Sequence, residues 1–220
     1  FLLTPASMSL ERPSSPLQLT VNDDWQNVFS RKARVALGDR LIPYLQTQRW
    51  FGGKARHVKA ATFSEIVPFS FDTTSVSLTQ VLIEYTEYDP ETYSLPLAFA
   101  SGDRATHIRE TAPNTVLANI TVRNKRGDKT GLLYDAVHER EFCKSLVDMI
   151  ARKRQVRGTA GDFVAAPTKA LRNEKLGSVT NLEVASMRAE QSNSSIVFGD
   201  RLILKLFRRT EIGTNPDLEL

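Results

Sequence analysis

Alternation of apolar and polar residues through the middle of the chain, from about residue 57 to residue 122, constrains the fold most strongly. Because successive side chains of a strand point to opposite faces, a period of two indicates β-strands. The clearest series has a phase slip near Gln80 that predicts a β-bulge, and its apolar members are Val76, Leu78, Val81, Ile83 and Tyr85. Several such segments, separated by turn residues, predict an antiparallel sheet.

Other segments continue the strand pattern. Residues 95–99 alternate, and Pro96 among them predicts an edge strand because proline donates no ladder hydrogen bond. Residues 116–122 alternate too, and a turn containing Gly127 is expected to return the chain as a paired strand over residues 132–134. Towards the C-terminus, three more strands are expected over about residues 181–190, 194–199 and 201–208.

Two helices are expected where apolar residues recur at helical spacing. The first covers about residues 24–42, follows the N-cap candidates Asn22-Asp23-Asp24, and is expected to end or kink at Pro43. The second covers about residues 138–152 and places Cys143 beside its apolar face. Cys143 is most simply a small core residue, and the alternative is a reactive thiol.

The two ends of the chain carry different signals. Residues 1–20 contain three prolines and little periodicity, which predicts a linker. The first residue is Phe, so we expect the chain to begin inside a longer polypeptide. At the other end, Asn215 and Pro216 predict the start of a final helix, because asparagine favours the N-cap and proline the first helical position.

Composition narrows the cell compartment and the partners. One cysteine excludes an internal disulfide and fits a reducing cytosol, so we expect a cytoplasmic protein. No apolar run approaches the roughly 20 residues that cross a bilayer, and no membrane partner is expected. The net charge is only +4, and the basic run at residues 152–157 lacks aromatic residues for stacking on bases. A solvated helix end explains this run better than nucleic-acid binding.

Lys205 stands alone in an apolar strand, after a short polar stretch at residues 191–195. Alternation places it on the face of Ile203 and Phe207, and a lysine on a half-buried face needs a counter-charge. Glu219, in the expected final helix, is the nearest candidate in sequence. A phosphate loop, a strand lysine and a helix glutamate follow this order in the ATP-binding half of protein-kinase-like folds. The alternative is a plain β-meander in which the lysine snorkels to solvent.

Two stretches, AEQSNSSIVFGDRLILKLFRR followed by NPDLEL and QRWFGGKAR near residue 50, resemble the maltokinase family. These bacterial enzymes, related to aminoglycoside and other eukaryotic-like small-molecule kinases, transfer the γ-phosphate of ATP to maltose and give maltose 1-phosphate for α-glucan synthesis. The resemblance covers about residues 22–220. It implies an α+β fold: a cystatin-like cap, with a helix on a curved antiparallel sheet, followed by a truncated protein-kinase-like N-lobe. The implied divisions are 1–20 (linker or end of a preceding domain), 21–112 (cap) and 113–220 (incomplete N-lobe).

The resemblance also implies roles for individual residues. Lys205 would hold the α- and β-phosphates of ATP, and Glu219 would pair with it. The phosphate loop would comprise Gln191, Ser192, Asn193, Ser194 and Ser195, although it lacks the glycines of the usual pattern. In the family the catalytic aspartate, the Mg²⁺ ligands and the maltose pocket belong to a C-terminal lobe, expected beyond Leu220. The fragment alone is therefore expected to be inactive. The scattered residues His57, His107 and His138 have no metal-ligand spacing.

Two questions stay open at this point. The start FLLTP resembles the end of a trehalose synthase, so the alternative function is a non-catalytic cap module that docks a fused or partner trehalose synthase. The corner Arg49–Lys54 is either a structural turn, with Trp50 and Phe51 buried and two glycines permitting a reversal, or a surface presented to the substrate cleft.

Overall fold

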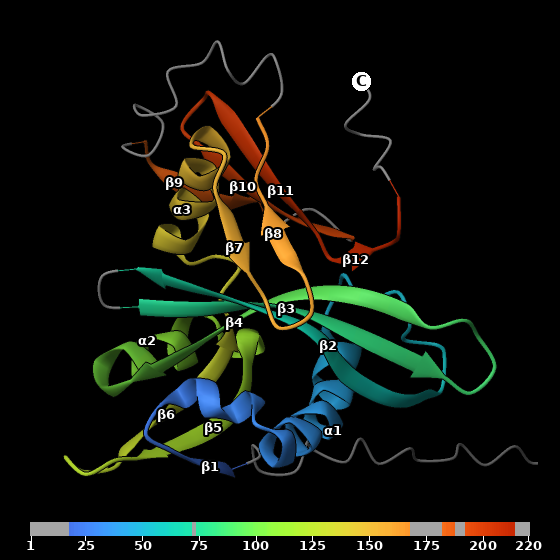
Figure 1. Ribbon diagram of the computed structural model, residues 1–220, viewed down its shortest axis with the longest axis vertical. Coiled ribbons are helices and arrows are strands. Elements are labelled where there is room, and N and C mark those ends of the chain that lie inside the picture. The colour runs from blue at the N-terminus through green and yellow to red at the C-terminus, as the bar shows by residue number, and fades with distance from the viewer. Residues whose placement is uncertain (1–17, 72–73, 168–181, 188–191, 214–220) are drawn as a thin grey trace, which may run out of the picture.

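A computed structural model describes residues 18–71, 74–167, 182–187 and 192–213. Its centre is a curled, seven-stranded sheet in the order β1-β5-β6-β4-β3-β2, with β12 paired to β4 (Figure 1). All neighbours run antiparallel except β1 and β5, which are parallel. The strands are β1 (Gln18–Asn22), β2 (Val58–Phe71), β3 (Thr74–Tyr85), β4 (Glu91–Ser101), β5 (Val116–Arg123), β6 (Lys129–Asp135) and β12 (Arg209–Thr210).

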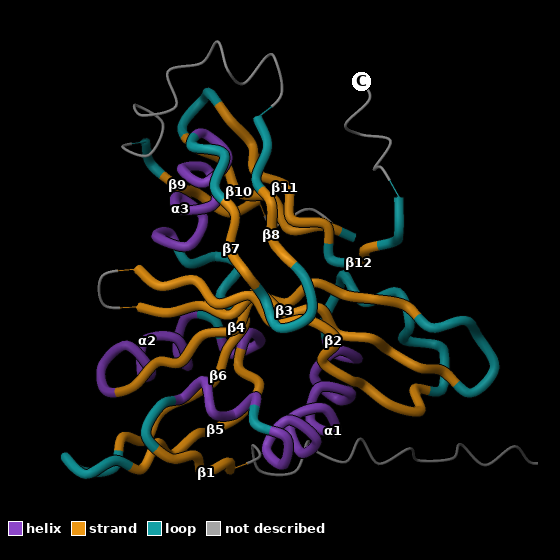
Figure 2. Tube along the Cα trace, viewed as in Figure 1, coloured by secondary structure: helices purple, strands orange, loops and turns teal. Residues whose placement is uncertain are grey.

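Among the described residues five helical segments accompany the sheet, and α1 and α3 lie on opposite sides of it (Figure 2). Asp24 caps the first segment through a 2.7 Å hydrogen bond from the backbone N–H of Gln26 to its carboxylate. None of the described helices is long and apolar enough to cross a membrane. The segments are η1 (Trp25–Phe29), α1 (Arg31–Thr47), α2 (Gly102–Thr111), η2 (Pro113–Thr115) and α3 (Arg140–Ala151).

Of the two outcomes expected at Pro43, an end or a kink of the first helix, the end is wrong, because α1 continues to Thr47. Proline removes the hydrogen bond to the carbonyl of Asp39 and crowds that carbonyl, but both residues lie on the exposed side of the helix, where the carbonyl can tilt outward and bind water. Buried Leu41 and Leu45, on either side of Pro43, hold the helix on the sheet. Packing therefore overrides the local signal.

The expectation that Pro96 marks an edge strand is also wrong. β4 lies inside the sheet between β3 and β6. The β6 ladder reaches only to Leu97, the β12 ladder only to Tyr93, and Pro96 lies between them on that side. Its carbonyl accepts a 2.8 Å hydrogen bond from the N–H of Ala136, just past the end of β6. The missing proline N–H thus falls in a gap between two partner strands, where no ladder donor is needed.

The phase slip near Gln80 has a different cause from the one expected. The register between β3 and β4 is continuous, and the irregularity is in β2, between Phe63 and Glu65. Val76 and Leu78 belong to one core, whereas Val81 belongs to the other. The strand therefore changes the face it buries without an inserted residue of its own.

Both faces of the large sheet are buried. On β4, Tyr93, Leu95 and Leu97 pack into a core with α1, while Ala98 and Ala100 point to the opposite face and pack into a second core with α3. Cys143 lies in this second core, where burial raises the pKa of its thiol to about 12, as suits a structural cysteine.

The division expected after residue 112 cuts through the large sheet. β5 and β6 follow that residue, yet β6 pairs with β4 and β5 pairs with β1. Residues 116–135 therefore belong to the same sheet as the strands before them. The remaining strands lie outside it: β7 (Gln155–Arg157), β8 (Asp162–Val164), β9 (Val184–Met187), β10 (Asn193–Phe198) and β11 (Leu202–Phe207).

The β7–β8 hairpin overlaps the large sheet in the view of Figure 1, and Glu65 of β2 holds its turn. The Glu65 carboxylate accepts hydrogen bonds from the backbone N–H groups of Thr159, at 2.6 Å, and Ala160, at 3.0 Å. Desolvation raises the pKa of Glu65, but these bonds outweigh it and hold the pKa below its usual value. A charged carboxylate thus closes the turn of the hairpin.

Candidate functional site

Lys205 lies on the exposed face of β11, in the three-stranded sheet β11-β10-β9. The alternation predicted from sequence is confirmed up to Leu206, because Leu202, Leu204 and Leu206 pack toward the second core while Ile203 is 57% exposed. No salt bridge among the described residues involves Lys205. Its expected partner, Glu219, lies outside the described residues.

The polar stretch before β11 is only partly a loop. Gln191 lies outside the described residues, Ser192 immediately precedes β10, and Asn193, Ser194 and Ser195 are strand residues rather than loop residues. Their ladder with β11 explains this, since Ser194 lies opposite Leu206 and Ser195 opposite Lys205. Both serines are buried.

Arg208 is the residue that sequence reasoning missed. It follows β11 directly, and its side chain is only 1% exposed. Its Nη2 lies 2.8 Å from Oδ2 of Asp135, at the end of β6, and its Nε donates to Oγ of Ser194 at 2.8 Å. Its guanidinium carbon lies 4.6 Å from the centre of the Trp50 ring, within cation–π range. One arginine therefore joins the small sheet to the large one.

Asp135 is held from its own side as well. The backbone N–H of Val137 donates to Oδ1 at 3.1 Å, and the Tyr44 hydroxyl lies 3.4 Å from Oδ2. Burial, with the nearby Asp135 charge, raises the pKa of Tyr44 well above its usual value, so the phenol stays a donor. Both charges of the pair therefore have additional polar partners, as buried charges require.

A polar cavity of about 540 Å³ lies at this junction. Asn193 and Ser194 line it together with Arg49 and Trp50. The structure therefore brings the Arg49–Lys54 corner close to the start of the β10–β11 hairpin, the hairpin that carries Lys205. The walls also include His138, whose pKa is lowered by desolvation. No cluster of three metal-ligating side chains occurs in the described part of the chain. The cavity offers hydrogen bonds and an aromatic face rather than a set of catalytic groups.

The corner itself is shaped by crowding. Phe51 is buried, Trp50 is half-buried, and neither Gly52 nor Gly53 has a positive φ. A Cβ on Gly53 would meet the Tyr85 hydroxyl and lie 2.7 Å from the Phe51 ring. Glycine is therefore needed at position 53 because a side chain has no room there. It is not needed for a special backbone conformation, which was the reason expected from a tight reversal of the chain.

Arg56, just past the corner, belongs to a second charged cluster. Its Nη1 lies 2.9 Å from Oε1 of Glu91, and Arg209 reaches the same oxygen at 3.1 Å. The hydroxyls of Tyr85 and Tyr93 donate to Oε2 at 2.7 and 2.8 Å. Desolvation raises the pKa of Glu91, but the four donors prevail and lower it below the usual value.

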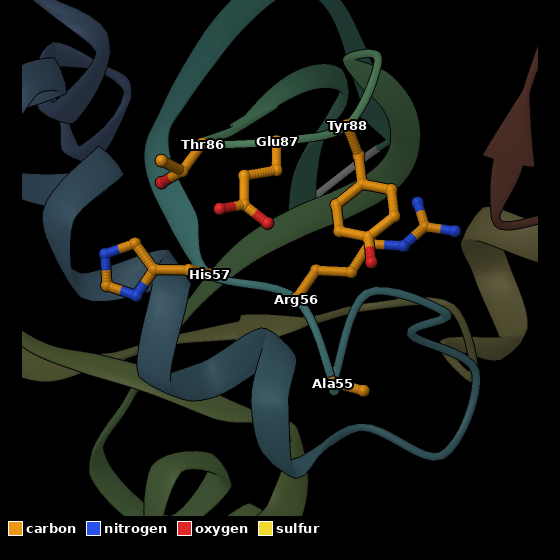
Figure 3. Close-up of a pocket in the computed structure, with 6 residues that line it drawn as sticks. All are labelled: Ala55, Arg56, His57, Thr86, Glu87 and Tyr88. Atoms are coloured by element: carbon orange, nitrogen blue, oxygen red, sulfur yellow. The ribbon is translucent and has the colours of Figure 1, made fainter.

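The surface pocket beside Arg56, about 400 Å³, is formed by two loop segments. The guanidinium of Arg56 lies 4.7 Å from the centre of the Tyr88 ring, while His57 points away from both (Figure 3). Arg56 is already engaged by Glu91, so this pocket has a structural explanation and offers less than the junction cavity.

Residues 44–139 match the family model of the maltokinase N-terminal cap domain. The matched range begins within α1, includes β2 to β6, and ends just before α3. It therefore extends past residue 112 and takes in β5 and β6, two strands of the large sheet. The match supports the resemblance drawn from QRWFGGKAR, which lies inside it, whereas Lys205 and the small sheet lie outside it.

Proposed function

We propose that this chain, with its maltokinase-type cap, is the N-terminal part of an ATP-dependent maltose kinase. The match of residues 44–139 to the cap-domain model is the observation that carries this proposal. A cap of this kind implies a kinase parent. The reaction we propose for that parent is transfer of the γ-phosphate of ATP to maltose, giving maltose 1-phosphate, in the cytoplasm.

The small sheet supports the nucleotide part of the proposal. Its three strands are consecutive and antiparallel, and the third carries Lys205 on an exposed face. A cation on that face, with no ion pair among the described residues, suits an anionic ligand. Lys205 would contact the α- and β-phosphates, with Glu219 orienting it. Gln191 and Ser192 would approach from the end of the hairpin.

Mg²⁺ would neutralise the phosphoryl oxygens during transfer. As the resemblance to the maltokinase family implies, we place its ligands in a C-terminal lobe of the parent, with the catalytic aspartate and the maltose pocket. Lys205 would not hold the metal ion, and its only role would be to stabilise the phosphoryl oxygens by its positive charge. The 220-residue chain is therefore expected to show no maltose-dependent ATP turnover.

The second candidate is a non-catalytic module that docks a trehalose synthase, fused upstream or separate. The cap-domain match favours it only in that the matched range excludes the lysine hairpin. Maltose-dependent ATP turnover by the parent separates the two candidates, because a docking module has none.

The test of the kinase proposal is Lys205→Met in the full-length parent, since Met keeps the length of the stem and removes the charge. With ATP saturating, we expect kcat to fall by at least about 10²-fold, because the charge acts on the phosphoryl oxygens. Lys129→Met, at another exposed strand lysine, is the matched control and should leave kcat unchanged. A kcat for Lys205→Met within about twofold of the parent would defeat the proposal.

A further inference from the structure

One residue separates the strand that carries Lys205 from the large sheet. β11 ends at Phe207, Arg208 is buried at the junction, and Arg209 begins β12, opposite Tyr93 of β4. Strand residues advance roughly 3.3 Å each, so Lys205 lies about 10 Å from the anchored arginine. The position of Arg208 therefore limits where Lys205 can lie.

Arg208 contacts groups from several separate elements. Its Nη2 and Nε contact Asp135 and Ser194, and its guanidinium stacks on Trp50. Its carbonyl accepts a 2.6 Å hydrogen bond from the N–H of Ser94 on β4. Contacts to side chain and backbone together fix the strand in position and in rotation. The neighbouring Arg209 adds a second contact, to Glu91.

A buried ion pair is not the most effective way to stabilise such a junction. Charges lose hydration on burial, and well-packed apolar residues of similar volume often serve stability as well or better. What the planar guanidinium provides is direction, because its N–H groups point in fixed directions and charge-assisted hydrogen bonds are short and directional. The arrangement is thus suited to setting a geometry.

We propose that Asp135 and Arg208 are positioning residues for Lys205, through which the large sheet fixes the lysine against the nucleotide phosphates. The inference rests on the proposed kinase function. It assigns to the cap-type sheet a part in nucleotide binding that involves no contact between that sheet and the nucleotide.

The experiment compares ATP with adenosine in the full-length parent. Asp135→Asn removes the charge from the Arg208 partner without changing its shape, and Lys205→Met removes the phosphate contact itself. We expect Asp135→Asn to weaken ATP binding by about tenfold or more, since small misplacements of this kind are costly. Adenosine binding should change by less than about twofold, because adenosine has no phosphates. A merely structural role would weaken both ligands alike.

The double variant Asp135→Asn/Lys205→Met makes the test a cycle. If Asp135 acts through Lys205, the double variant binds ATP no more weakly than Lys205→Met alone. Independent, multiplicative losses overturn the inference while leaving the kinase proposal intact. If Lys205→Met itself leaves ATP binding unchanged, the kinase proposal fails, and the inference fails with it.

Glu139→Gln is the matched control, because Glu139 pairs with Arg104 at 2.7 Å whereas Arg208 pairs with Asp135. It should leave the ratio of ATP to adenosine affinity unchanged. Should Asp135→Asn not fold, Ser194→Ala replaces it, since it removes only the 2.8 Å hydrogen bond to Nε of Arg208. The same loss confined to ATP supports the inference, and equal losses for both ligands overturn it.

Discussion

Glu91, at the start of β4, is a buried carboxylate with two arginines and two tyrosine hydroxyls around it. Burial and the neighbouring Glu91 charge raise the pKa of Tyr93 to about 12, so this phenol remains a donor across the neutral range. The donors in turn keep Glu91 ionised. The two groups reinforce each other, and the stability that they provide depends on the charge of Glu91.

We therefore expect the free energy of unfolding to depend on pH, and we expect Glu91→Gln to reduce this dependence. The folded-state pKa of Glu91 is lowered, so its contribution is complete above the unfolded pKa of about 4.3 and is lost as pH falls through the folded value. At pH 7 Glu91→Gln should lower the free energy of unfolding by about 1–3 kcal/mol. Urea unfolding between about pH 5 and pH 3 should then show a shallower fall for the variant.

The control for this prediction is Glu84→Gln, an exposed position on β3. It should change stability by less than about 0.5 kcal/mol and keep the parental acid sensitivity. Equal slopes for Glu91→Gln and the parent would show that the charge of Glu91 contributes nothing to stability.

Sequence reasoning singled out Lys205 but not Arg208, and the difference is physical. Lys205 contrasts with its apolar neighbours, so alternation alone places it on one face of a strand. Arg208 sits in FRR, which looks like a solvated strand end. Its burial depends on Asp135 and Trp50, which are distant in sequence and which no local pattern connects to it.

Elements with strong periodicity were predictable, and the exceptions have identifiable causes. Residues 116–135 form the expected hairpin, and α3 follows its apolar face. α2 was missed because only Ala105 and Ile108 are buried in it, too few apolar positions for a helical period. Pro96 and Pro43 are unfavourable inside a strand and a helix, but the tertiary structure accommodates both. Pro96 lies in a gap between two partner strands, and Pro43 lies on an exposed side of its helix.

The β7–β8 hairpin gives a prediction at this scale. Because the Glu65 carboxylate accepts from the N–H groups of Thr159 and Ala160, Glu65→Ala should release the turn. Hydrogen exchange at these two amides should accelerate by at least about tenfold, the effect of losing roughly 1.4 kcal/mol of local protection. Amides of β3 should not change, and Glu84→Ala should leave the hairpin unaffected. Unchanged exchange at Thr159 would mean that other contacts hold the turn.

At the scale of the whole molecule, one sheet supports two cores. The core with α1 and the core with α3 share the strands of the large sheet, so removing either layer exposes apolar residues of the same strands. A boundary placed inside the sheet divides both cores. The matched cap region, residues 44–139, contains most of the sheet but leaves α3 outside.

Two fragments test this arrangement. Residues 18–115 lack β5, β6 and β12, so β4 loses both of its partners on one side and β1 loses its only strand partner in the described structure. We expect this fragment to bind ANS and to unfold without a cooperative transition. Residues 18–167 keep these strands and α3, and should unfold cooperatively. A sharp thermal transition for 18–115, equal to that of 18–167, would show that β5 and β6 are dispensable.

The pairings of β1 with β5 and of β12 with β4 have a consequence for folding kinetics. In each, partners separated by about a hundred residues must meet, and such long closures slow folding. During synthesis β1 emerges early and finds no ladder until β5 has been made. β12 completes the sheet last, and it does so with the segment that directly follows Lys205. The strand that carries Lys205 therefore reaches its final position in the same late step that closes the sheet. A chain stalled before residue 208 would have neither the β12–β4 pairing nor Lys205 in its final position.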